Sequence, residues 1–187
     1  MHGDEPKGVH VARCFLDLLR CDPLLSADVH WTVLPVANPD GFSRGTRRNA
    51  HRIDINRNFP TANWELLSSR SRMFGGWEPA SEPETRALIS MIERWKPNRI
   101  ITIHSIGANR FCNNYDGPGR RLAKCLHGHN GYPVTDSIGY ATPGSFGTWA
   151  GRERGLATVT LELPSTHSSK RCWDDNRDAL LAAGSLV

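Results

Sequence analysis

The sequence predicts an α/β fold in which helices flank a largely parallel or mixed central sheet. Apolar runs typical of buried strands occur at residues 29–36, 99–104 and 156–163, and segments with helical apolar spacing lie between and around them. Strands that alternate with helices are typical of the α/β class. The length of 187 residues fits one domain with a substantial core, so we expect a single domain over residues 1–187.

The first third of the chain predicts a helix, a strand and a long loop. Pro6 suits a first helical turn, and a helix over residues 7–20 follows from the apolar positions Val9, Val11, Ala12, Phe15, Leu16 and Leu19. The run "VHWTVLPV" at 29–36 predicts a buried strand. Residues 37–73 show no sustained period, and an irregular segment of this length is either disordered or functional.

The remainder of the chain alternates helices and strands. Ser81 and Glu84 have the spacing of a capping box at the start of a helix over 81–95. The further elements that we expect are a strand at 99–104, helices at 119–129 and 145–154, a strand at 156–163 and a closing helix at 170–187.

Composition narrows the function classes. The formal charge of +4 is mildly basic and the arginines are dispersed, which does not favour nucleic-acid binding. Five cysteines without a CxxC pair suggest reduced thiols and therefore a cytoplasmic protein. We find neither a leader sequence nor an apolar run of membrane-spanning length, so no membrane partner is expected, and the oligomeric state stays open.

Titratable residues interrupt two of the apolar strands at their carboxyl ends. His104 ends "RIITIH" and Glu162 lies near the end of "LATVTLEL", which is where open α/β sheets place ligand sites. His2 and Glu5 are one helical turn apart and can face one point. Alone, each is explained as well by a solvated pair at a helix start or a hydrogen-bonded core residue. Together, His2, Glu5 and His104 have the layout of a zinc site with two histidines and one carboxylate, and Glu162 can serve as its base.

The motifs "HGDE", "NPDG", "DINRNFP", "TIHS" and "TLELP", in this order, resemble the zinc metallocarboxypeptidase family. The longer phrases "NPDGFSRGTRRNAHRIDINRNFPTANW", "SEPETRAL" and "SIGYATPGSFGTWAG" resemble the bacterial murein peptide amidases within it. The resemblance spans nearly the whole chain. It implies a zinc-carboxypeptidase-like mixed sheet in one catalytic domain over 1–187, and zinc-dependent hydrolysis of the γ-D-glutamyl to diaminopimelate bond of small murein peptides during cell-wall recycling.

The resemblance also implies roles for residues around the metal. His2, Glu5 and His104 resemble the ligands of one Zn²⁺ ion per chain, and Glu162 resembles the general base that later acts as an acid. Asp54 of "DINRN" resembles the carboxylate that orients a ligand histidine.

A second group resembles the substrate-binding residues. Asn56 and Arg57 resemble the clamp for the free carboxylate of a small peptide substrate. Arg47, with Arg44 as the competing candidate, resembles the cation that faces the oxyanion, and Tyr140 resembles a mobile phenol that closes over substrate.

The sequence departs from the family at two places. Relatives place a strand directly before the His-x-x-Glu turn, whereas only Met1 precedes His2, so we expect the N-terminal strand to be missing and residues 1–6 to form a frayed terminus. Relatives tend to have glycine where Arg52 stands. Other readings stay open: a generic zinc carboxypeptidase, an acyl-amino-acid deacylase, or a catalytically silent relative or fragment that binds peptide carboxylates.

Overall fold

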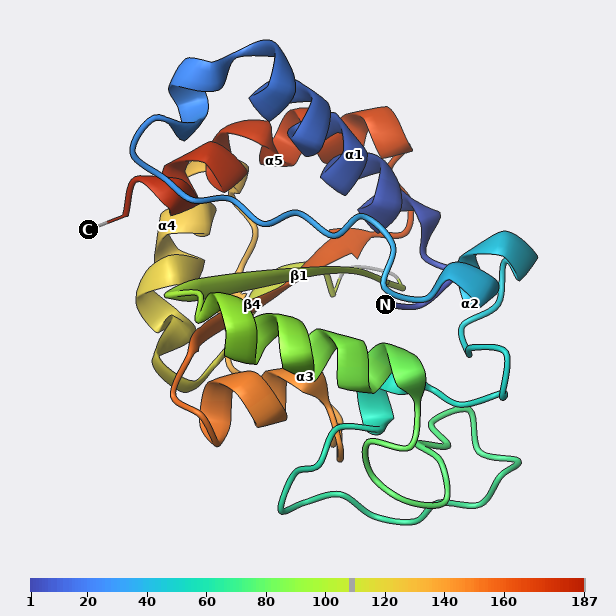
Figure 1. Cartoon of the computed structure of the whole chain (residues 1–187). Helices are drawn as coiled ribbons and strands as arrows, with labels where there is room; N and C mark the ends of the chain where they lie inside the picture. Colours follow the sequence, from blue (N-terminus) through green and yellow to red (C-terminus); the bar gives the residue numbers. More distant parts are fainter. Residues whose placement is uncertain (108–109, 187) are drawn as a thin grey trace.

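The computed structural model describes residues 1–107 and 110–186 and has three layers (Figure 1). A four-stranded sheet has the order β1-β4-β2-β3 and consists of β1 (Arg99–Ile106), β4 (Ala157–Pro164), β2 (Cys112–Asp116) and β3 (Val134–Thr135). β1 and β4 are parallel, whereas β2 runs antiparallel to β4. The mixed α/β architecture that the sequence predicts is therefore confirmed.

Helices cover both faces of the sheet. On one face, α1 (Pro6–Cys21), α4 (Arg120–Asn130) and α5 (Ser169–Gly184) pack on the apolar side chains of β1 and β4. On the opposite face, α3 (Pro83–Trp95) and a short π-helical turn, η4 (Thr148–Arg152), enclose a second core around Phe59 and Trp149. The remaining short helices are η1 (Pro23–Ser26), α2 (Pro39–Arg44), η2 (Ile55–Arg57) and η3 (Gly117–Gly119).

The register of β1 and β4 positions the two strand-end residues. Side chains alternate between the faces of a strand. Ile103 and Leu161 therefore face the core under α1 and α5, while His104 and Glu162, which are direct partners in the parallel ladder, point to the other face. A single register thus brings the predicted ligand and the predicted base to the same side of the sheet.

The expected strand at 29–36 is wrong, since this stretch contains no strand. Its Trp31 and Val33 instead pack against the core formed by α1 and α5. The apolar side chains that suggested a strand thus pack against helices, and the segment forms no β-ladder.

Other boundaries also differ from expectation. β2 was not predicted because its sequence, CNNYD, is mostly polar. Pro83 occupies the first turn of α3 and makes Glu82 the N-cap, so the Ser81–Glu84 capping box does not form. The helix expected over 145–154 is present over 146–152, and its last five residues form the π-helical turn η4. In the described part of the chain, no helix is both long and apolar enough to span a membrane.

The loop over 37–73 is held by buried polar side chains. Asn38 caps α2 by accepting from Gly41 N, and Asn58 donates to Gly75 O at 2.7 Å. Asn49 Oδ1 accepts from the backbone of both His51 and Ile53. Arg52, between them, has φ of +64°, a backbone conformation that favours glycine. Arg52, where relatives tend to have glycine, therefore adopts a backbone conformation that glycine would adopt more easily.

Candidate active site

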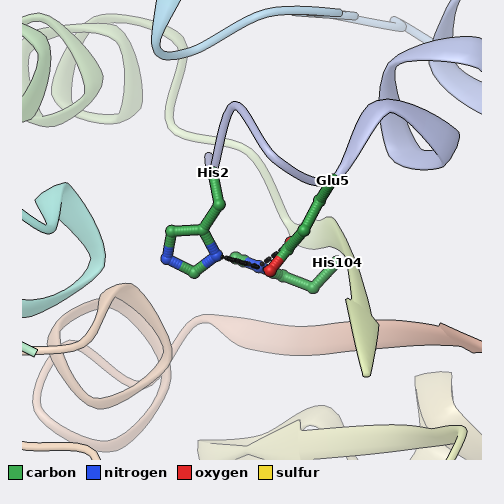
Figure 2. Close-up of side chains that lie close together, drawn as sticks. All are labelled: His2, Glu5 and His104. Atoms are coloured by element: carbon green, nitrogen blue, oxygen red, sulfur yellow. Dashed lines mark hydrogen bonds and ion pairs between the residues drawn. The ribbon is translucent and has the colours of Figure 1, made fainter. Parts of the chain in front are cut away.

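Three side chains from distant parts of the chain converge at one point (Figure 2). His2 Nδ1 lies 2.8 Å from Glu5 Oε1, and His104 Nδ1 lies 2.9 Å from Glu5 Oε2. The two Nδ1 atoms are 3.2 Å apart. The potential ligand atoms of the three residues all lie within 4.8 Å of one another.

The start of the chain is packed rather than frayed, in contrast to the expectation from its terminal position. His2 is 5% exposed. Gly3 lies so close to α2 that a Cβ at this position would be 1.9 Å from the carbonyl carbon of Gly41. Glu5 is the N-cap of α1, and its backbone N–H donates to His2 O. The close backbone contact and this turn fix the two donors before the helix begins.

Asp54 and Arg47 surround the outer side of the cluster. His2 Nε2 lies 3.0 Å from Asp54 Oδ1, so this nitrogen donates and leaves the lone pair of Nδ1 facing Glu5 and His104. Arg47 Nε donates to Asp54 Oδ2 at 2.9 Å, and Arg47 Nη1 lies 3.2 Å from His2 Nδ1. Asp54, which is completely buried, therefore orients both His2 and the arginine beside it.

The charges of the cluster are strongly coupled. Burial opposes ionisation of Glu5, but His104 and His2 outweigh it and hold the pKa of this carboxyl well below its usual range. Burial also opposes protonation of His2, but Asp54 and Glu5 raise its pKa. Burial lowers the pKa of His104 to about 4, which keeps its imidazole neutral and able to bind a metal.

The donor set fits zinc. Imidazole nitrogen and carboxylate oxygen are common zinc ligands, and bond lengths of about 2.0–2.1 Å place the ligand atoms of one tetrahedral ion roughly 3.3 Å apart. The three separations of 2.8, 2.9 and 3.2 Å are close to this value. An Nδ1 lone pair that faces a carboxylate and a second imidazole nitrogen also requires a cation or a proton between them. His2, Glu5 and His104 are thus the residues that can hold the metal.

Glu162 lies beside the cluster and is 6% exposed. Burial is the main cause that raises its pKa, to about 7, and the negative charge of Glu5 adds to the effect. A carboxyl group whose pKa lies near neutrality is suited to accept and return a proton. Glu162 shares no hydrogen bond with His2, Glu5 or His104, so it is free for that task.

A cavity of about 950 Å³ opens from the cluster, and Asn56 and Arg57, the predicted carboxylate clamp, line it. Arg57 is buried, and its Nε has no hydrogen-bond partner within the described residues. Asn56 Oδ1 accepts from Phe146 N at 2.9 Å, which leaves the amide nitrogen of Asn56 as a donor. The two side chains therefore offer unpaired donors to the cavity, as a clamp for an anion requires.

The structure separates the two arginine candidates for the oxyanion. Arg47 lines the cavity beside the cluster, whereas Arg44 is exposed at the end of α2 and is not among the cavity residues. Tyr140 lines the cavity and is 45% exposed, so its phenol lies at the rim. The geometry thus brings together every predicted site residue except Arg44.

The cavity residues that were not anticipated include Asn114 and Asp116 on β2, and Arg152 at the end of η4. Asn114 and Asp116 are two positions apart, and this spacing was the available signal that they share one face of a strand. It is a weak signal, because a five-residue polar stretch is equally typical of a loop.

Comparison with known families and proteins places these features in context. The pattern of the zinc carboxypeptidase family matches residues 1–116. Murein peptide amidase A of Escherichia coli strain K12 is 36% identical over 180 residues, which cover 90% of this chain and 70% of that protein. Murein peptide amidase A of Vibrio campbellii is 37% identical over 193 residues, 97% of this chain and 73% of that protein.

Solved structures show the same similarity. Murein-tripeptide amidase from Escherichia coli O157 superposes with a TM-score of 0.77 at 32% identity, covering 97% of this chain and 76% of that one. Carboxypeptidase A from Helicoverpa armigera has a TM-score of 0.78 at 20% identity, covering 98% of this chain and 58% of that one, a likeness of fold alone.

Proposed function

The chain belongs to the zinc carboxypeptidase family and is a zinc-dependent hydrolase of peptide amide bonds, and on this basis we propose that it cleaves the γ-D-glutamyl to diaminopimelate bond of murein peptides. The observation that carries the proposal is the convergence of His2, Glu5 and His104 at one end of a cavity that Glu162 also lines. The murein bond itself is suggested by the two amidase relatives.

We propose that His2, Glu5 and His104 hold one zinc ion per chain. Zinc, when bound in such a site, polarises the amide carbonyl and lowers the pKa of a water molecule. Asp54 keeps His2 in the tautomer whose Nδ1 faces the site. The packed start of the chain fixes His2 and Glu5 in advance, which lowers the cost of forming the site.

Glu162 is the general base in this proposal. It takes a proton from the attacking water and afterwards delivers it to the nitrogen of the leaving group. Its buried position beside the cluster, with a pKa raised to about 7, supports both steps. A protein that only bound peptides would not need such a group.

Arg47 and Arg57 each stabilise one negative charge of the reacting peptide. Arg47, held by Asp54, presents a fixed guanidinium where negative charge develops on the carbonyl oxygen, and loss of one such donor typically costs about 3–4 kcal/mol. Arg57 and Asn56 bind the free carboxylate of the peptide, which gives the unpaired Arg57 Nε a partner. Tyr140 closes the rim of the cavity over substrate.

We place this activity in the cytoplasm, where small murein peptides are recycled. All five cysteines are free, and thiols stay reduced in that compartment.

The test compares two substrates on the zinc-loaded chain. L-Ala-γ-D-Glu-meso-diaminopimelate should be cleaved with a kcat/KM well above that of a hippuryl dipeptide with an apolar C-terminal residue. Faster cleavage of the hippuryl substrate would identify a generic carboxypeptidase instead.

The variant Glu162→Gln separates an enzyme from a binding protein. It should retain zinc while its turnover falls by at least ~100-fold, because it loses proton transfer and keeps the metal ligands. A parent chain that binds zinc and tripeptide but cleaves neither substrate would be the catalytically silent relative.

A further inference from the structure

The antiparallel pair of β2 and β4 forms the floor of the cavity beyond Glu162. Cys112 pairs with Glu162, Asn114 with Thr160, and Asp116 with Thr158. Residues two apart share a face, so the side chains of Asn114 and Asp116 continue the row that starts at the catalytic carboxylate. Four residues of strand separate the two ends of this row, about 13 Å at ~3.3 Å per residue. The far end is therefore reached only by a long side chain of the substrate.

Two acceptor atoms on this floor, Asn114 Oδ1 and Asp116 Oδ2, take part in no hydrogen bond among the described residues. Asn114 is 9% exposed, and its Oδ1 is buried without a hydrogen bond in the described part of the chain. Asp116 Oδ1 accepts from Arg152 Nε at 2.6 Å, but no hydrogen bond to Asp116 Oδ2 occurs among residues 1–107 and 110–186. Leaving a buried acceptor unpaired costs about 1–3 kcal/mol, a cost that a donor on a ligand would remove.

Gly147 lets the Asp116 carboxylate lie directly against the backbone. A Cβ at position 147 would lie 2.2 Å from Asp116 Oδ2, so any larger residue would displace the carboxylate or fill the space next to it. Gly151, one turn along η4, is equally restricted, because its Cβ would lie 2.5 Å from Asp116 Cβ. Gly147, which precedes η4, and Gly151 within it thus let Asp116 lie against this turn and still line the cavity.

Arg152 supplies the opposite charge at the same end. Its side chain is 57% exposed, so the guanidinium bonds Asp116 at one edge and keeps donors available to solvent and to the cavity. Acceptors at Asp116 and Asn114, next to a guanidinium, complement a group that carries an ammonium and a carboxylate on one carbon.

We propose that Asp116, Asn114 and Arg152 form a subsite for the side chain of the leaving residue, specific for a long side chain that ends in an amino-carboxylate. The ammonium binds Asp116 Oδ2 and Asn114 Oδ1, and the carboxylate binds Arg152. This inference rests on the proposed function, since meso-diaminopimelate has such an end, and it assigns the selectivity to residues that the chemistry of cleavage does not use.

The experiment measures kcat/KM of the zinc-loaded full chain for three peptides L-Ala-γ-D-Glu-X, in which X is meso-diaminopimelate, L-lysine or L-norleucine. Lysine keeps the ammonium and lacks the distal carboxylate, and norleucine lacks both. Asp116→Asn should lower the diaminopimelate-to-norleucine ratio by at least ~30-fold, as expected for loss of a charged partner. Arg152→Gln should lower the diaminopimelate-to-lysine ratio by ~10-fold and leave the lysine-to-norleucine ratio within about twofold.

Matched controls are Asp174→Asn and Arg177→Gln, which change the same charges on the exposed face of α5 and should leave all ratios as in the parent. If Asp116→Asn does not fold, Asn114→Ala tests the same subsite, because Asn114 Oδ1 has no hydrogen bond to lose, and it should lower the diaminopimelate-to-norleucine ratio by ~5-fold or more. Ratios within twofold of the parent, or an equal fall for all three peptides, would overturn the subsite.

A calorimetric titration of the Glu162→Gln chain with the same peptides separates this inference from the proposed function. Tightest binding of the diaminopimelate peptide, lost in the Asp116→Asn double variant, supports the subsite even where the parent cleaves none of the three. Equal dissociation constants for the three peptides would refute the subsite whether or not cleavage occurs.

Discussion

Two regions of one cavity differ in how their polar groups are satisfied. In the metal cluster (His2, Glu5, His104, Asp54 and Arg47), each side chain bonds at least one other member. In the recognition wall (Asn56, Arg57, Asn114 and Asp116), Arg57 Nε and Asn114 Oδ1 are buried without a partner in the described residues. The members of the cluster thus bond one another, whereas the wall presents polar atoms that a substrate can pair.

The difference shows where each region places the free-energy cost of its polar groups. Mutual hydrogen bonds hold the donors of the cluster in place before a ligand arrives, which is the arrangement that catalysis requires. The unpaired groups of the wall destabilise the empty cavity, and a ligand that satisfies them regains that free energy as selectivity. Variants in the cluster should therefore change metal binding and turnover, and variants in the wall should change the choice of substrate.

The largest effect is expected for His104→Ala. Two donors remain, so the affinity for zinc should fall by at least ~1000-fold, beyond the 10- to 100-fold typical of partners outside the ligand set. Competition with a chelator of known affinity measures this. His167→Ala is the matched control, since His167 pairs with Asp175 on another part of the surface and should not alter zinc binding. Unchanged affinity in His104→Ala would move the metal site elsewhere.

An intermediate effect is expected at Arg57, and it should depend on the substrate. Arg57→Ala should lower kcat/KM by ~100-fold for a peptide with a free C-terminal carboxylate and far less for its C-terminal amide, with zinc content unchanged. Arg57→Lys should repair little, because a point charge does not reproduce the guanidinium fork.

Arg20→Lys, in an exposed pair on α1, is the control for an arginine-to-lysine change as such. An equal loss on the acid and the amide would mean that Arg57 supports the fold of the wall and does not read the carboxylate.

The smallest effect is expected at Arg52, in the loop that joins the two regions. Arg52→Gly relieves a side chain at φ +64° and should raise the free energy of unfolding by about 0.5–1 kcal/mol, after the greater chain entropy of glycine is subtracted. Denaturant unfolding measures this. Arg52→Ala removes the same side chain and keeps the strain, so an equal gain in that variant would assign the effect to the side chain and not to the backbone.

The sequence predicted the parts of this fold whose local pattern and final environment agree. The helices α1, α3, α4 and α5 and the strands β1 and β4 follow from apolar periodicity, since each buries one stripe or face. Residues 29–36 have the composition of a strand, but Trp31 and Val33 pack on helices. The error at β2 was the opposite one: a true strand was missed. Its sequence is mostly polar because Asn114 and Asp116 line a cavity. Which strand pairs with which is decided by contacts distant in sequence.

The site divides in the same way. The convergence of His2, Glu5 and His104 was predicted because the residue types in these motifs are ones that bind metals or transfer protons. The choice between Arg44 and Arg47 required the structure, because only the turn after α2, closed by Gly45 at φ +63°, sets which arginine reaches Asp54. The leaving-group subsite was missed, since Arg152 and Asp116 are 36 positions apart and meet only through the packing of η4 on β2.

The separation of the donors along the chain gives a bound ion a mechanical role. Glu5 and His104 are 99 positions apart, and His2 is also supplied by the first turn of the chain. An ion shared by them closes a long loop in the way a covalent crosslink does, and the entropy lost on closing such a loop grows only slowly with its length. Because an ion that binds only the folded chain adds RT ln(1 + [Zn²⁺]/Kd) to the free energy of unfolding, the melting temperature should increase with free zinc. An ion held by the proposed ligands would thus also fasten α1 to the central sheet.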